Sequence, residues 1–244
     1  MLKIGKSALP GGRCLRLVSP VGPNTKLLTQ SPIAAFRYED DKRFKWFGLD
    51  HISVSQLKTT FVTHFPSNLS PTSTNGLILA ILIKLYKDHN VVPLLQDLCY
   101  APIPDVYSQA LIKALTPSFT DVLSLPSTNT FVKDNVGGVA GRVRLNSISL
   151  PSSSSSSSKI SALYPSSVSF INHSCTPNAQ ISSSEDATLT LHSHNGQGLP
   201  ADTEIMIDYM GSFVGKQAKK KRLLFENYGF VCTCPKCSRI KLAK

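Results

Sequence analysis

The chain has 244 residues, a hydrophobic fraction of 41% and a mean hydropathy of −0.01. These values are typical of a soluble globular protein with one or two domains. No segment approaches the roughly 20 continuous apolar residues of a membrane helix, and the basic start of the chain is followed by Pro10 and two glycines, which argues against a secretory signal. The net charge of +11 favours anionic partners such as nucleic acid, chromatin or an acidic substrate.

The N-terminal half is expected to combine short strands with a helical insert. Leu15–Val18 and Lys26–Thr29 are apolar-leaning runs bounded by turn residues, which predicts two β segments. Apolar residues at helical spacing predict a helix over Gly76–His89, and a second helix is expected over Asp105–Leu115. Both helices fall within an insert that we place at residues 37–135.

The C-terminal half is expected to be mainly β. Strands are predicted over Arg142–Leu150, Thr188–His192 and Glu204–Ile207. The serine run Ser152–Ser158 cannot bury apolar area, so we expect a disordered surface loop there. Lys216–Tyr228 is expected to form a helix that leads into a cluster of cysteines.

The first part of that helix, Lys216–Arg222, carries five positive charges. Such a run is either the solvated face of a helix or a patch for nuclear localisation or nucleic-acid contact. Charge alone does not separate these two interpretations.

The distribution of the cysteines favours a reducing compartment and a metal site. Cys232, Cys234 and Cys237 crowd too closely to pair with one another, which argues against a disulfide framework. Zn²⁺ takes four donors, and short Cys spacings let one loop supply several of them. We expect Cys175 to supply the fourth ligand. Four thiolates leave no open position for water, so a structural role is expected.

Three segments in this order resemble the signature of a SET-domain protein methyltransferase. They are Asn172–Asn178 (NHSCTPN), Glu204–Tyr209 (EIMIDY) and Cys232–Cys237 (CTCPKC). The SET-and-MYND (SMYD) group is the most similar, although residues 36–135 contain Cys99 as their only cysteine and therefore lack the MYND finger. The resemblance implies a β-rich α+β SET fold with pseudoknot-like C-terminal threading.

The resemblance also divides the chain. Within a SET domain over residues 1–238, residues 10–36 would supply N-terminal strands and residues 141–212 the core motifs. Residues 213–238 would form a post-SET helix and zinc segment.

The resemblance implies transfer of a methyl group from S-adenosylmethionine (SAM) to a lysine of a histone or another protein. This is an in-line displacement that depends mainly on positioning. Tyr209 is implied as the catalytic tyrosine, and Tyr228 and Ile148 as walls of the lysine channel. The residues implied in cofactor binding are Arg13, Asn146, Ser169, Asn172, His173 and Phe230. Zinc would order the post-SET segment, which is too short to fold on its own apolar area.

One departure from the family pattern keeps a second interpretation open. Gly12-Arg13-Cys14 resembles the G-x-G turn of a SET domain, but Cys14 stands where a second glycine would let the backbone approach the cofactor. The alternative is a catalytically inactive SET domain that serves as an interaction module. A third interpretation, nucleic-acid binding through Lys216–Arg222, predicts binding that weakens steeply with salt. We expect a monomer without membrane contact, located in the nucleus or the cytoplasm.

Overall fold

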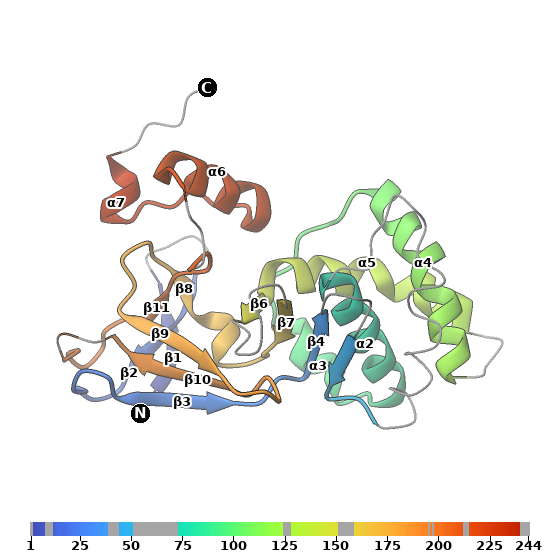
Figure 1. Cartoon of the computed structure of the whole chain (residues 1–244), viewed down its shortest axis with the longest axis horizontal. Helices are drawn as coiled ribbons and strands as arrows, with labels where there is room; N and C mark the ends of the chain where they lie inside the picture. Colours follow the sequence, from blue (N-terminus) through green and yellow to red (C-terminus); the bar gives the residue numbers. More distant parts are fainter. Residues whose placement is uncertain are drawn as a thin grey trace. The chain divides into compact units, whose positions relative to one another are not determined.

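The computed structural model describes residues 2–7, 12–38, 44–50, 73–123, 128–150, 159–194, 196, 198–211 and 215–239. The predicted loop Ser152–Ser158 lies outside these residues. The chain divides into two compact units, and Figure 1 shows the elements of each. Unit 1 contains Met1–Gln30, Ser167–Ser182 and Thr188–Lys244, and unit 2 contains Ser31–Ser166 and Ser183–Ala187.

Unit 1 is built from short strands. Strands β1 (Leu2–Lys6) and β2 (Arg13–Leu17) form an antiparallel hairpin. Strands β3 (Lys26–Gln30), β10 (Leu189–Ser193) and β9 (Ala179–Ser183) form a sheet in the order β3-β10-β9. The three strands predicted at the positions of β2, β3 and β10 are therefore confirmed.

Residues 203–207 run between an N-terminal strand and a mid-chain strand. On one side, Leu17 N–H donates to Thr203 O at 3.0 Å and Ile205 N–H donates to Leu15 O at 2.8 Å. On the other side, β11 (Met206–Ile207) pairs in parallel with β8 (Asn172–His173). This double pairing is what the expected C-terminal threading requires, and it places two of the signature segments side by side.

In the described part of unit 1, two helices lie close together (Figure 1). The predicted helix is confirmed as α6 (Gln217–Tyr228), and the cysteine-rich segment ends in the single turn α7 (Pro235–Ser238). A short 3₁₀ turn, η2 (Val168–Phe170), precedes β8.

Unit 2 contains a four-stranded antiparallel sheet in the order β5-β4-β7-β6. Its strands are β4 (Ala34–Tyr38), β5 (Phe44–Phe47), β6 (Ser147–Leu150) and β7 (Lys159–Leu163). The sequence prediction of a strand over Arg142–Leu150 is wrong in its first half, because Arg142–Asn146 is the last part of helix α5 (Thr128–Asn146). Buried Val132, Val136, Val139, Ala140 and Val143 follow a helical period that outweighs the local alternation.

The described part of unit 2 contains four helices, and the core lies between them and the sheet (Figure 1). The predicted helices are confirmed as α2 (Ser73–Lys87) and α4 (Asp105–Leu123), and α3 (Val91–Gln96) and α5 were not predicted. Leu77–Ile83 of α2 are all at most 1% exposed. A Cβ atom on Gly76 would meet the Phe36 ring at 2.3 Å, so glycine lets α2 approach β4 closely. None of the described helices is long and apolar enough to cross a bilayer.

Candidate active site and metal centre

Asn178, the last residue of the NHSCTPN segment, fastens that segment to the strand end that precedes Tyr209. Its side-chain amide donates to Glu204 O at 2.8 Å and accepts from Met206 N–H at 2.8 Å. Its backbone N–H also donates to Met206 O at 3.2 Å. Because an Asn side chain offers both a donor and an acceptor, it can pair with the backbone of residues 204–206 as a neighbouring strand would.

His173 is buried and neutral. Burial lowers its pKa to about 4, although Asp208 nearby acts in the opposite direction. Its Nδ1 accepts the Tyr209 N–H at 3.2 Å, so the remaining ring proton belongs on Nε2. Nε2 lies 3.2 Å from the Cys175 sulfur and can donate to it.

Tyr209 lies in a cluster of rings that belong to separate parts of unit 1. Its hydroxyl donates to Ile171 O at 2.6 Å. Its ring centroid lies 5.0 Å from that of Tyr228, 5.3 Å from that of His173 and 6.3 Å from that of Phe230. Burial raises the pKa of Tyr228. We call these four residues the aromatic cluster. Tyr209, Tyr228 and Phe230 pack against the cysteines, and His173 contacts the Cys175 sulfur.

A polar group of residues adjoins β8 on the side of the N-terminal hairpin. Asn172 donates through Nδ2 to Arg13 O at 3.1 Å and to the Glu204 carboxylate at 2.8 Å. Ser7 Oγ also donates to Glu204, at 2.9 Å. The Arg13 guanidinium lies 4.4 Å from the centroid of the Phe170 ring. Asn172 and Arg13, both predicted to contact the cofactor, are therefore neighbours, and Ser169 lies on η2 beside Phe170.

Cys14 is a strand residue with a fully buried side chain. It is the second residue of β2, opposite Gly5 of β1, and burial raises the pKa of its thiol. Gly12, by contrast, has a φ of +69°, a left-handed conformation that favours glycine. The backbone conformation thus explains why glycine occupies position 12. Position 14, in contrast, is a packed position of the hairpin.

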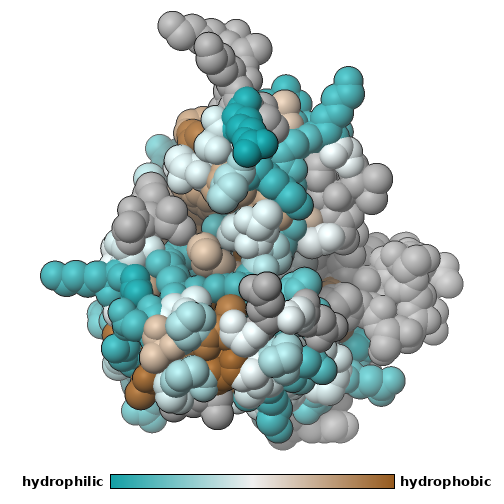
Figure 2. Space-filling model, turned by 90° about the vertical axis from the view of Figure 1, so that its left-hand side faces the viewer, coloured by the Kyte–Doolittle hydropathy of each residue, from teal (hydrophilic) through white to brown (hydrophobic). Residues whose placement is uncertain are grey.

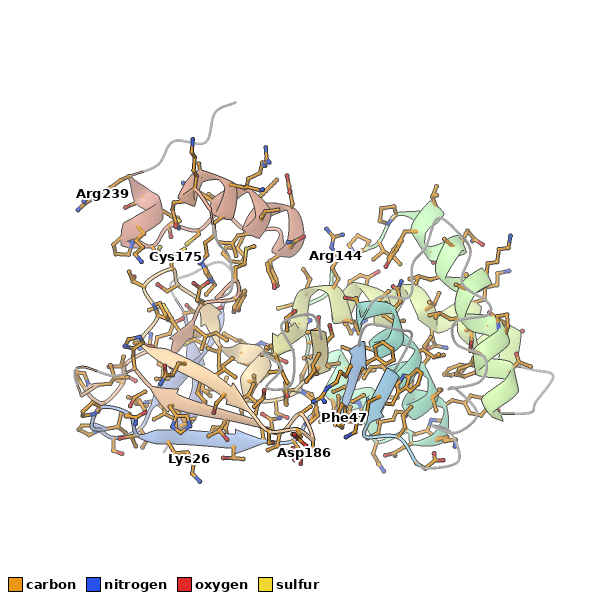
Figure 3. All side chains as sticks on the ribbon, viewed as in Figure 1. Lys26, Phe47, Arg144, Cys175, Asp186 and Arg239 are labelled. Atoms are coloured by element: carbon orange, nitrogen blue, oxygen red, sulfur yellow. The ribbon has the colours of Figure 1, made fainter. Side chains whose placement is uncertain are left out.

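Cys175, Cys232, Cys234 and Cys237 form one cluster, as predicted, with ligand atoms within 4.8 Å of one another. Figure 3 shows Cys175 on the side of unit 1 that carries α6 and α7. Four sulfurs bound to one zinc ion at about 2.3 Å lie about 3.8 Å apart, and the Cys175 and Cys237 sulfurs are 3.7 Å apart. The donor set and its spacing therefore fit a tetrahedral zinc ion.

The thiols of this cluster differ in acidity before any ion is considered. Burial raises the pKa of Cys175 and that of Cys232, the latter to about 11. Burial acts in the same direction on Cys234, but backbone N–H groups, including that of Cys237 at the start of α7, lower its pKa to about 7. A bound Zn²⁺ deprotonates its thiol ligands outright.

Asn146 and Ile148 belong to unit 2, whereas the other predicted site residues belong to unit 1. Asn146 closes α5, and its Nδ2 donates to Cys99 O and to Arg142 O, both at 2.7 Å. Ile148 lies on β6 and is half-buried. The cofactor role of Asn146 and the channel role of Ile148 stay predictions.

The basic stretch is divided between the interior and the surface. Lys220 and Lys221 are 7% and 8% exposed, whereas Lys216, Lys219 and Arg222 are exposed. The face of unit 1 in Figure 2 is mostly hydrophilic, with small hydrophobic patches. Only part of the run can therefore serve as a surface patch.

Four residues with clear structural roles were given none by sequence reasoning. Glu204 and Asn178 belong to the EIMIDY and NHSCTPN motifs, so their presence in these motifs could have indicated a structural role. Asp208 precedes Tyr209 and pairs with Lys220 at 2.5 Å. Gln217 has no sequence signal, because its partners are cysteines far away in the chain.

The chain belongs to the SET-domain family, whose profile matches residues 14–210. Human "Protein-lysine N-trimethyltransferase SMYD5" is 41% identical over 68 residues, which cover 27% of this chain and 16% of that protein. A SET and MYND domain-containing protein of Dictyostelium discoideum is 40% identical over 76 residues, 31% of this chain and 21% of that protein. The chain therefore matches only a small part of the length of these relatives.

A solved structure shares the fold. The crystal structure of the SET domain of LSMT bound to lysine and AdoHcy aligns with a TM-score of 0.54 and 15% identity, covering 95% of this chain and 53% of that one. This likeness confirms the SET-domain fold expected from the sequence.

Proposed function

We propose that the protein is a SAM-dependent protein-lysine N-methyltransferase with one structural zinc ion. The observation that carries this proposal is the placement of Tyr209 within the aromatic cluster, against the NHSC segment of a SET domain. The names of the relatives support the reaction class, since SMYD5 is a protein-lysine N-trimethyltransferase. The LSMT structure contains lysine and AdoHcy, the form that SAM takes after losing its methyl group.

The residue types fit SAM. A guanidinium (Arg13) suits its carboxylate, amide and imidazole groups (Asn172, His173) suit its polar atoms, and an aromatic ring (Phe230) suits its adenine. Ser169 completes the contacts predicted within unit 1, and the cofactor role of Asn146 stays a prediction. SAM supplies the methyl group when bound.

The protein's own contribution is positioning. The Tyr209 hydroxyl has a polar partner at Ile171 O and can orient the neutral amine of a lysine by hydrogen bonding. His173 holds the backbone of Tyr209 through Nδ1, which requires its neutral state. Tyr228 would form a wall of the lysine channel, and the channel role of Ile148 stays a prediction. The four cysteines would hold zinc and thereby fix the segment that carries Phe230.

The substrate class follows from the same proposal. A protein with a target lysine, either a histone or a non-histone protein, would bind, and the exposed charges of Lys216–Arg222 could meet an acidic or chromatin surface. We also propose that the protein acts as a monomer in the nucleus or the cytoplasm.

A catalytically inactive SET domain is the second candidate. Cys14 at the place of a family glycine motivates it. Its burial in the hairpin reduces the weight of this observation, because the side chain packs inward within unit 1. The presence of Tyr209, Asn172 and His173 favours the enzyme.

Calorimetric titration with SAM tests the proposal. We expect saturable binding with one molecule per chain, and weaker binding in Asn172→Ala, whose amide holds the Arg13 backbone. Asn227→Ala, at an exposed position of α6, is the matched control and should bind like the wild type. Absence of saturable binding in the folded, zinc-loaded protein would refute the enzyme and support the interaction module.

A further inference from the structure

The side chain of Gln217, the first residue of α6, faces the thiol cluster. Its Nε2 atom donates to the Cys175 sulfur at 3.0 Å and to the Cys237 sulfur at 3.1 Å. A carboxamide nitrogen carries two hydrogens, so it can make both bonds at once. These two sulfurs come from segments 62 positions apart in the chain. One amide therefore bridges ligands that the backbone does not hold together.

Lys221, one turn further along α6, lies on the same side. Its ammonium group donates to Cys237 O at 3.2 Å, and the residue is only 8% exposed. Lysine is rarely buried without a compensating interaction. Beside the cluster, such an interaction is available from the charge of the centre itself.

The contacts of Gln217 and Lys221 can stabilise the negative charge of a four-thiolate zinc centre. Four thiolates and one Zn²⁺ leave a net charge of about −2, and a buried negative charge is stabilised by N–H donors and by a nearby cation. Gln217 and the Nε2–H of His173 are such donors, and Lys221 is such a cation.

We propose that Gln217 and Lys221 make α6 the outer hydrogen-bonding layer of the zinc centre, with Gln217 positioning the Cys175 and Cys237 thiolates and Lys221 compensating their charge. The inference rests on the proposed zinc ion but not on methyl transfer. It also gives two residues of the basic stretch, which the sequence connected with nuclear localisation or nucleic acid, a role in supporting the metal ligands.

Zinc affinity, measured by competition with a chromophoric chelator, tests this role. Gln217→Leu removes both donors at similar volume and should weaken zinc binding about 10- to 100-fold. Gln217→Glu places a carboxylate beside two thiolates and should weaken it further. Lys219→Leu, an exposed position on the same helix, is the control and should bind zinc like the wild type.

Two further readouts separate positioning from a general loss of structure. Replacement of zinc by Co²⁺ gives a thiolate-to-metal absorption band that should shift in Gln217→Leu, because the hydrogen bonds to sulfur are lost. Lys221→Met should weaken zinc binding, and Lys221→Arg, which keeps the charge, should restore most of it. If a Gln217 variant fails to fold, the Lys221 pair still decides the charge role. Wild-type zinc affinity and an unchanged cobalt spectrum in Gln217→Leu and Gln217→Glu would overturn the proposal, whatever the methyltransferase assay gives.

Discussion

Single residues at the site act mainly through the backbone groups that they hold. The Asn178 amide binds Glu204 O and Met206 N–H, and His173 binds Tyr209 N–H. The position of the Tyr209 side chain therefore depends on side chains that hold the backbone before and at Tyr209. This explains why the NHSCTPN segment extends to its final asparagine.

Replacement of Asn178 by Ala should lower the free energy of unfolding by about 1 to 3 kcal/mol, since two backbone groups lose their partner. Urea denaturation of the zinc-loaded protein measures this change. Asn178→Asp keeps the acceptor for Met206 N–H but loses the donor to Glu204 O, so it should be intermediate. Equal stability of Asn178→Ala and the wild type would contradict the role assigned to the amide.

The role of a residue could be predicted where it depends on a local sequence pattern, and not where it depends on tertiary contacts. The cysteines were predictable because three thiols at such short spacing are typical of metal ligands, and Cys175 joined them through its motif. Gln217, Lys220 and Asp208 were not predictable. Their roles come from tertiary contacts that leave no pattern in the local sequence.

At the scale of elements, α6 is tied to the strand end that carries Tyr209. The Lys220 ammonium lies 2.5 Å from the Asp208 carboxylate, with side chains 9% and 21% exposed. Asp208 also accepts the Met210 N–H at 3.0 Å, so the ion pair fixes the turn around Tyr209. The helix therefore contributes to the site from outside the SET motifs.

Lys220→Met should destabilise the protein by about 2 to 4 kcal/mol, because it leaves a partly buried carboxylate without its cation. Thermal or urea unfolding measures the loss. Arg222→Met removes an exposed charge from the same helix, where the Glu226 pair spans 3.5 Å, and should cost less than about 1 kcal/mol. Equal effects of the two substitutions would show that the Lys220–Asp208 pair has no special weight.

Zinc removal should loosen the post-SET segment and expose its thiols. With zinc bound, a thiol reagent should react quickly with Cys99, the one exposed cysteine among the described residues. After treatment with a strong chelator, four further thiols should react, those of Cys175, Cys232, Cys234 and Cys237. Cys14, buried in the hairpin, should remain slow in both states. An unchanged thiol count after chelation would contradict a zinc centre.

Elements were predictable where periodicity was strong and local. The apolar spacing of α2 and the turn-bounded runs of β2, β3 and β10 gave correct predictions. The C-terminal part of α5 was taken for a strand, because Val143 and Leu145 alternate with polar residues over a short stretch. The longer helical period from Val132 to Val143 decides the structure, since it faces the core of unit 2.

At the scale of the whole molecule, the SET fold was predictable from the order of three short motifs. These motifs all lie in unit 1, where residues 203–207 join the hairpin to β8. Unit 2 has a helical core of its own, and two of the four helices that its described residues form were predictable. The five positive charges of Lys216–Arg222 suggested a more basic surface than this stretch has, because Lys220 and Lys221 are buried.

Methyl transfer from radiolabelled SAM to lysine peptides, with the zinc-loaded wild type and Tyr209→Phe side by side, tests the central claim most directly. We expect the wild type to label lysine-containing peptides and not their Lys→Arg counterparts. Tyr209→Phe removes the hydroxyl that donates to Ile171 O and should lower the rate at least about tenfold, a loss of roughly 1.4 kcal/mol in transition-state stabilisation. No labelling by the folded wild type, or full activity in Tyr209→Phe, would contradict the account.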